Sequence, residues 1–117
     1  MNTKENILIL AKNTILSESE SIAKLIDFID FNFAEATQTL FNSKGRLIVT
    51  GIGKSAIIAQ KMVATFNSTG TPALFLHAAE AIHGDLGMVQ PDDIVLCISK
   101  SGNSPEIKIL VPLVKRF

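Results

Sequence analysis

A short strand pattern that ends in a glycine turn, Arg46–Lys61, constrains the fold of this chain more than any other feature. The apolar run Leu47–Val49 stops at Gly51, and a helical pattern follows Gly53. A strand, a glycine turn and a helix in this order form the first half of a βαβ unit. Such a turn directs backbone N–H groups and the positive end of a helix at one place, which favours an anion such as phosphate. Lys54 adds a full positive charge there.

Three functional interpretations of this turn compete with a purely structural one, a tight turn beside a solvated lysine. A Walker A loop requires a glycine five residues before Gly53, where Ile48 stands, so we exclude it. The spacing of Gly51, Gly53 and Ala56 fits the dinucleotide pattern G-x-G-x-x-[GA], but the acid expected near the end of the second strand is missing. The third interpretation is a small phosphorylated ligand with Lys54 close to its reacting atoms.

The composition limits the classes of partner. A length of 117 residues favours one domain. The 11 basic residues balance the 11 acidic ones and are scattered, which argues against nucleic acid. The chain shows neither a cleavable signal pattern nor an apolar run near the ~18 residues of a membrane span, so we expect a cytoplasmic protein without a membrane partner. Its single cysteine, Cys97, lies in an apolar run and is expected to be buried and inert.

The rest of the chain alternates helical and strand patterns. Apolar residues at steps of three and four predict one long helix over residues 3–31, in which the polar run Ser17–Ser21 is either the outer face or a break. The segment 77–88 is polar and rich in glycine, which predicts a loop outside the core. The other expected elements are a helix over 33–41, strands over 46–50, 73–76 and 94–98, and helices over 54–67 and from Pro105 onward. The continuous apolar character of 94–98 predicts a strand buried on both faces.

This alternation predicts a three-layer, Rossmann-like α/β domain in which helices cover a parallel sheet. Right-handed crossovers place the carboxyl ends of all three strands at one edge of the sheet. Ligands bind at that edge, where the strand order reverses. We therefore expect the glycine turn, the segment 77–88 and the turn that begins at Ser99 to share one crevice.

The turn after the third strand, Ser99–Glu106, offers three hydroxyl groups, a glycine and a helix N-terminus. Those are donors that a phosphate monoester requires. A structural alternative is an ordinary helix start, in which Ser104 caps the helix and Glu106 interacts with the dipole in its first turn. A cap explains Ser104 but leaves Ser99 and Ser101 without a role.

The segment between the second and third strands holds four side chains that can bind a metal or transfer a proton: His77, Glu80, His83 and Asp85. All four can bind a metal, and a site would use His77 and His83, but their spacing matches no strong zinc signature. Acid–base chemistry is a second interpretation, because histidine titrates near neutral pH. The third is a surface loop whose histidines cap a short helix.

Taken together, the motifs GIGKS, STGTPALFLHAAEAIHGDLGMV and SKSGNSPE resemble the sugar isomerase (SIS) domain, and more closely its D-arabinose 5-phosphate isomerase branch. The resemblance covers nearly the whole chain and implies one SIS domain over residues 1–117, with N-terminal helices over 3–43 and a sheet core over 46–117. It implies interconversion of D-ribulose 5-phosphate and D-arabinose 5-phosphate, a step toward the bacterial surface sugar Kdo. It also implies a homo-oligomer, with a tetramer as the usual state, and no cofactor.

The resemblance assigns roles to individual residues. Lys54, Glu106 and His83 match catalytic positions, with Glu106 implicated in proton transfer. The substrate-binding positions that it implies are Gly53, Ser55, His77, Glu80, Asp85, Ser99, Ser101, Gly102, Asn103 and Ser104. The chemistry agrees with these residue types, because a carboxylate can remove the proton next to a carbonyl and a lysine can stabilise the enediolate oxygens.

The sequence departs from the family pattern at three places. Ala56 replaces a glycine, and Lys100 replaces a small polar residue between two serines. Family members continue through two more strands that supply a glutamate and a histidine, so we expect the sheet to be incomplete at Phe117 and its third strand to be an exposed edge. We therefore expect the chain to be either a fragment of a longer isomerase or a sugar-phosphate-binding module without turnover.

Overall fold

The structure is a computed structural model that describes residues 2–116. The chain divides into two compact units between Thr39 and Leu40, and each is described by itself. The first unit contains helix α1 (Thr3–Lys24), the 3₁₀ helix η1 (Leu25–Phe28) and most of helix α2 (Phe31–Phe41).

Helix α1 is shorter than the single helix predicted over residues 3–31. The polar run Ser17–Ser21 does not break it. Within this run the Ser19 and Ser21 hydroxyls donate to the carbonyls of Leu16 and Ser17, each at 2.9 Å, and the helix continues through them. The break falls at Ile29, whose backbone is extended, and Asp30 then caps α2 by accepting from the Phe33 N–H at 3.2 Å. No residue of α1 is buried within its own unit. None of the described helices is long and apolar enough to cross a membrane.

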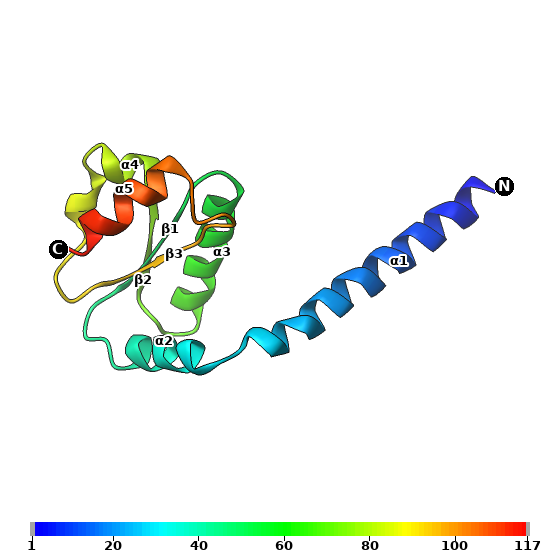
Figure 1. The fold of residues 1–117 in the computed structure, drawn as a ribbon, viewed down its shortest axis with the longest axis horizontal. Helices are drawn as coiled ribbons and strands as arrows, with labels where there is room; N and C mark the ends of the chain where they lie inside the picture. Colours follow the sequence, from blue (N-terminus) through cyan, green and yellow to red (C-terminus); the bar gives the residue numbers. More distant parts are fainter. Residues whose placement is uncertain (1, 117) are drawn as a thin grey trace. The chain divides into compact units, whose positions relative to one another are not determined.

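The second unit is built on a three-stranded parallel sheet in the order β2-β1-β3 (Figure 1). Strand β1 (Leu47–Gly51) lies in the centre, with β2 (Ala73–His77) on one side and β3 (Ile94–Cys97) on the other. The register pairs Leu47 with Ala73 and with Ile94. The strand order reverses at β1, and all three strands end at the same edge, as the alternation of elements predicts.

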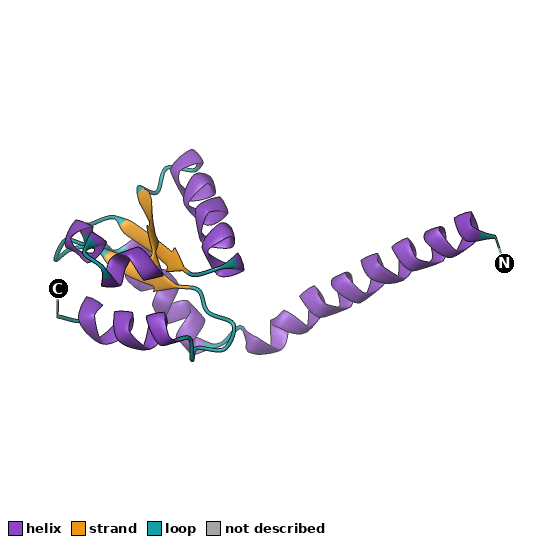
Figure 2. Cartoon of the chain, turned by 90° about the horizontal axis from the view of Figure 1, so that it is seen from above, coloured by secondary structure: helices purple, strands orange, loops and turns teal. Residues whose placement is uncertain are grey.

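Helices cover both faces of this sheet, which confirms the three-layer α/β prediction (Figure 2). Helix α3 (Lys54–Ser68) packs on one face, while α4 (Ala78–Ile82), η2 (Asp85–Met88) and α5 (Pro105–Val114) pack on the other. On the α3 face the buried core is Leu47, Val49, Ala59 and Ala73. On the opposite face it is Ile48, Leu76, Ala78, Ala81, Leu86, Val89, Ile107 and Leu110.

Small residues let α3 approach β1 closely. Ala56 and Ala59 are the buried residues of the helix, whereas Ile57 and Ile58 are exposed. A Cβ atom added at Gly51 would lie 3.0 Å from the backbone of Ser55, which is tighter than ordinary contacts. The glycine at the end of β1 is therefore needed for close packing of the helix that follows it.

The burial predicted for two segments was wrong. The segment 77–88 belongs to the core, because α4 buries Ala78 and Ala81 and η2 buries Leu86. The third strand is half-buried along its whole length rather than buried on both faces. It pairs with β1 alone among residues 2–116, so it is the edge strand that the resemblance implies.

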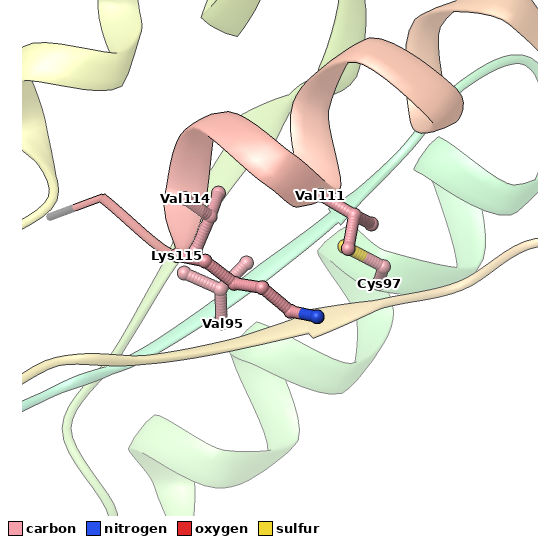
Figure 3. A pocket seen from close by; sticks show the side chains of 5 residues that line it. All are labelled: Val95, Cys97, Val111, Val114 and Lys115. Atoms are coloured by element: carbon pink, nitrogen blue, oxygen red, sulfur yellow. The ribbon is translucent and has the colours of Figure 1, made fainter.

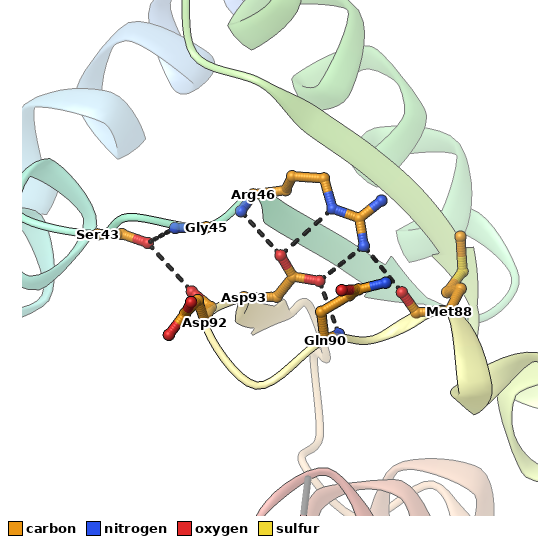
Figure 4. A network of polar contacts seen from close by, with 7 residues as sticks. All are labelled: Ser43, Gly45, Arg46, Met88, Gln90, Asp92 and Asp93. Atoms are coloured by element: carbon orange, nitrogen blue, oxygen red, sulfur yellow. Dashed lines mark hydrogen bonds and ion pairs between the residues drawn. The ribbon is translucent and has the colours of Figure 1, made fainter.

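A polar network joins the amino ends of β1 and β3 (Figure 4). The Asp93 carboxylate accepts from the Arg46 backbone N–H at 2.8 Å, from its Nε at 3.3 Å and from its second guanidinium nitrogen at 2.8 Å. It also accepts from the Gln90 N–H at 2.8 Å. The same guanidinium donates to the Met88 carbonyl at 2.8 Å. These bonds fix the turn before β3 against the start of β1.

Gly45 lies within this network at a position where no side chain fits. A Cβ atom there would lie 2.1 Å from the Asp92 carbonyl oxygen, a backbone atom that cannot move aside. We expect Gly45→Ala to lower the free energy of unfolding by about 1–3 kcal/mol through this overlap. Urea unfolding followed by circular dichroism measures the loss. Gly87→Ala is the control, since no atom lies within 4 Å of its added Cβ, and equal stability of the two variants would contradict the expectation.

Candidate functional site

The turn after β1 begins helix α3 at the carboxyl edge of the sheet. Gly53 adopts a φ of 61°, a conformation that residues with a side chain rarely adopt. As the N-cap residue of α3 it can offer no side chain to the first N–H groups of the helix. Lys54 is exposed and Ser55 is half-buried at this helix start. The turn therefore presents free backbone donors and one cation to the same place.

The turn after β3 lies beside it. The Ile98 N–H donates to the Thr50 carbonyl at 2.9 Å, so β1 and β3 stay together up to their last residues. Ser99 follows immediately, and α3 begins four residues after Thr50. Lys54 and the Ser99 turn consequently share the carboxyl edge, in agreement with the topology predicted from the sequence.

The serine turn is held in shape by its own side chains. The Ser99 Oγ accepts from the Gly102 N–H at 2.8 Å, and the Ser101 Oγ accepts from the Asn103 N–H at 3.1 Å. Gly102 has a φ of 70°, which allows the turn to close. Because both hydroxyls act as acceptors here, their own protons stay available for a ligand. The turn is preformed and still offers donors.

Ser104 is the N-cap residue of α5, but its side chain makes no capping hydrogen bond. Its Oγ is buried and has no hydrogen-bond partner among the residues that the structure describes. The alternative of an ordinary serine cap is therefore not realised. Glu106 is half-buried in the first turn of the same helix, as predicted.

Side-chain capping separates five of the described helices into two groups. Asn2 caps α1, Asp30 caps α2, and the His77 Nδ1 accepts from the Ala79 N–H at 3.2 Å to cap α4. The two helices that begin beside β1 and β3, α3 and α5, have no side-chain cap. Their N-termini are electrically positive and have free donors, which suits an anion.

The structure places the histidine segment partly at this edge. His77 ends β2 and Glu80 lies in the first turn of α4. The His77 ring uses Nδ1 for the cap and packs edge-on to Phe75 at 6.2 Å, so the capping alternative holds for it, while Nε2 has no hydrogen-bond partner among the described residues. His83 and Asp85 are exposed at the ends of α4 and η2. Neither makes a side-chain hydrogen bond within residues 2–116.

The four side chains do not form a metal site in the described part of the chain. No group of three or more histidine, cysteine, aspartate or glutamate side chains lies close enough there to hold an ion. A site on His77 and His83 is not supported by this arrangement. Lys54, Lys100 and Glu80 follow the ends of the three strands and are exposed.

A cavity of about 290 Å³ lies away from these turns, between β3 and the second half of α5 (Figure 3). Its walls are Val95, Cys97, Val111, Val114 and Lys115. Cys97 is half-buried rather than buried as predicted, and burial raises the pKa of its thiol. A raised pKa keeps the thiol protonated, so it is chemically quiet. None of the predicted site residues lines this cavity.

Sequence reasoning overlooked one residue at the edge. Thr50 is completely buried at the end of the central strand, and its Oγ1 has no hydrogen-bond partner among the described residues. The available signal was a single hydroxyl at the end of an otherwise apolar strand, directly before the glycine turn.

Comparisons with known proteins show what this chain is similar to. A family described as SIS domain matches residues 39–117. The arabinose 5-phosphate isomerase KdsD of Escherichia coli is 50% identical over 106 residues, which are 91% of this chain and 32% of that protein. The arabinose 5-phosphate isomerase KdsD of Pseudomonas aeruginosa is 44% identical over 119 residues, which are 100% of this chain and 36% of that protein. The chain thus spans about a third of the length of these curated relatives.

Solved structures give the same result at the level of the fold. An E. coli CFT073 protein in complex with arabinose 5-phosphate superimposes with a TM-score of 0.90 at 42% identity, covering 99% of this chain and 61% of that one. A candidate sugar-phosphate isomerase from Listeria monocytogenes has a TM-score of 0.90 at 32% identity over the same shares.

Proposed function

This chain belongs to the SIS domain family, and from that membership we propose that it binds a pentose 5-phosphate at the carboxyl edge of its sheet and interconverts the aldose and ketose forms. Arabinose 5-phosphate and ribulose 5-phosphate are the proposed pair, supported by the names of the relatives that are 44% to 50% identical. A role in Kdo synthesis, which the sequence resemblance implies, is part of the same proposal.

One observation supports the phosphate site most strongly. The two helices that begin beside β1 and β3 lack side-chain caps, although a serine stands at the N-cap of α5. A phosphate oxygen there would accept from the first N–H groups of the helices and from the hydroxyls of Ser99, Ser101 and Ser104. The positive φ angles of the two turns are allowed by Gly53 and Gly102, and Asn103 is part of the backbone of the second turn. Ser55 adds a further hydroxyl.

The proposed reaction moves one proton between neighbouring carbons. A base removes the proton from C2 of the open-chain aldose while O1 gains a proton, and the resulting enediol returns a proton to C1 as O2 loses its own. We assign the proton transfer to Glu106 and the stabilisation of the enediolate oxygens to Lys54. His83 is the proposed acid–base partner at the oxygens, with His77, Glu80 and Asp85 lining the sugar. Fixing the phosphate holds the reacting carbons in place, and no cofactor takes part.

A sugar-phosphate-binding module without turnover is the second candidate. The serine turn is fixed by hydrogen bonds, whereas His83 and Asp85 are exposed and make no side-chain hydrogen bond within residues 2–116. The serine turn proposed to bind phosphate is therefore more firmly positioned than these two residues, which are proposed to act on the sugar oxygens and to line the sugar. A single SIS domain over residues 1–117, a homo-oligomer and a cytoplasmic location remain predictions.

Calorimetry with three ligands tests the binding step. We expect arabinose 5-phosphate to bind at least roughly tenfold more tightly than arabinose, and inorganic phosphate to compete with it, because the phosphate supplies most of the recognition. NAD and NADP serve as controls for the dinucleotide interpretation and should not bind. Equal binding of arabinose and its 5-phosphate would contradict the proposal. Formation of ribulose 5-phosphate separates the isomerase from the binding module, which would bind without turnover.

A further inference from the structure

Two buried hydroxyl oxygens have no hydrogen-bond partner among the described residues: Oγ1 of Thr50 and Oγ of Ser104. Buried polar groups are normally satisfied, so an unpaired one requires an explanation. Here the two unpaired groups come from the end of the central strand and from the start of α5. Both are therefore at the carboxyl edge, where the phosphate site is proposed.

The topology places the two hydroxyls at the same edge and on the same face of the sheet, although they make no hydrogen bond to each other in the structure. Side chains alternate along a strand, so Thr50 faces the same side of the sheet as Ile48, which packs with Ile107 and Leu110 of α5. Ser104 lies one helical turn before Lys108, whose N–H donates to its carbonyl at 3.1 Å. Thr50 lies two residues after Ile48 along β1, and Ser104 lies about one turn before Ile107 at the start of α5. Both steps lead toward the carboxyl edge of the sheet. Thr50 and the start of α5 therefore share the carboxyl edge on this face of the sheet.

We propose that Thr50 is a positioning residue for the phosphate, acting through Ser104; this inference rests on the proposed function. When a phosphate oxygen accepts the Ser104 hydroxyl proton, the Thr50 hydroxyl donates to a free lone pair of the Ser104 Oγ. A serine oxygen can donate one hydrogen bond and accept two, so both contacts are compatible. The hydrogen bond from Thr50 fixes the orientation of the Ser104 hydroxyl, and the two consecutive hydrogen bonds strengthen one another. Ligand binding thereby satisfies both hydroxyls.

A buried hydroxyl that the fold merely tolerates would behave differently. Replacing it by a methyl group of the same shape would leave phosphate affinity unchanged and would keep or raise stability, since an unpaired polar group is removed. Thr50→Val makes that replacement, and Thr50→Ser keeps the hydroxyl while removing the methyl group. Comparison of the two variants separates hydrogen bonding from packing.

The test measures the affinity of the full chain for arabinose 5-phosphate and for inorganic phosphate by calorimetry. We expect T50V to lower the affinity for both ligands by the same factor, roughly five- to tenfold. T50S should bind them as tightly as the unchanged chain does. In an S104A background, T50V should have no further effect, because the residue through which it acts is gone. Should T50V fail to fold, T50A against T50S makes the same comparison, since both lose the methyl group and only T50A loses the hydroxyl.

The outcomes are distinct. Unchanged affinity in T50V, or an equal loss with and without the Ser104 hydroxyl, would overturn this inference and leave the proposed function intact. An unchanged chain that binds neither arabinose 5-phosphate nor inorganic phosphate would overturn both.

Discussion

Replacing Lys54 by methionine is expected to lower kcat for arabinose 5-phosphate by about 100- to 1,000-fold, the usual effect of removing one group that stabilises a developing oxyanion. Lys54 is exposed at the start of α3 and forms no ion pair within residues 2–116, so its charge is available to a ligand. Methionine keeps most of the length of the side chain and removes only the charge. Steady-state kinetics with detection of ribulose 5-phosphate measure the change.

The division of the effect between kcat and KM identifies the role of Lys54. A lysine that acts on the enediolate oxygens lowers kcat and leaves the binding of arabinose 5-phosphate nearly unchanged, whereas a lysine that contacts the phosphate weakens binding. Lys61→Met is the matched control, because Lys61 is an exposed lysine of the same helix two turns away from the edge. A kcat for K54M within about threefold of the unchanged chain would rule out the proposed role.

Replacing Asp93 by asparagine is expected to lower the free energy of unfolding by about 2–4 kcal/mol. The carboxylate is nearly buried and accepts hydrogen bonds from Arg46 and from the Gln90 backbone. An amide has one acceptor oxygen, and its NH₂ group would face donors. Asp92→Asn is the control, since Asp92 takes part in the network through its carbonyl oxygen only. Urea unfolding at pH 7 compares the variants, and a loss in D93N no larger than in D92N would contradict the assignment.

The same carboxylate predicts how stability changes with pH. Hydrogen bonds from the Arg46 side chain lower the pKa of Asp93 from 3.8 to about 2 in the folded chain. A lowered pKa means that the unfolded chain binds the proton first as the pH falls, so the stabilisation is complete above about pH 4 and is lost between about pH 4 and 2. The unchanged chain should therefore lose more stability than D93N across this interval. If the free energy of unfolding fell in parallel with pH for the two proteins, Asp93 would not contribute to the pH dependence of stability.

Local patterns predicted the sheet and the order of its elements because each depends on neighbouring residues. The run Leu47–Val49 before a glycine turn predicts β1, and the apolar runs that follow predict β2 and β3. The family resemblance added the expectation that β3 is an edge. The helix over residues 3–31 was predicted too long, because periodicity does not register the Asp30 cap that starts α2.

Burial was harder to predict because it depends on which elements meet. Ala78 and Ala81 lie between polar residues in the sequence, yet they are the small residues that let α4 pack against α5. The pairing of Arg46 with Asp93 joins residues distant in sequence, and no local pattern connects them. For the site, the serine turn and Lys54 were predicted at the correct edge, whereas the unpaired hydroxyl of Thr50 became apparent only once the end of β1 and the start of α5 were placed.

The central strand of the sheet is also the first strand in the sequence, and this order has a consequence for synthesis on the ribosome. Strand β1 emerges with both of its hydrogen-bonding sides open, and β2, the nearer partner in sequence, is available to it before β3. Closing the shorter loop costs less entropy, so we expect β1, α3 and β2 to associate before β3 is added. Until then one side of β1, apolar on both faces, is exposed to other nascent chains and to chaperones.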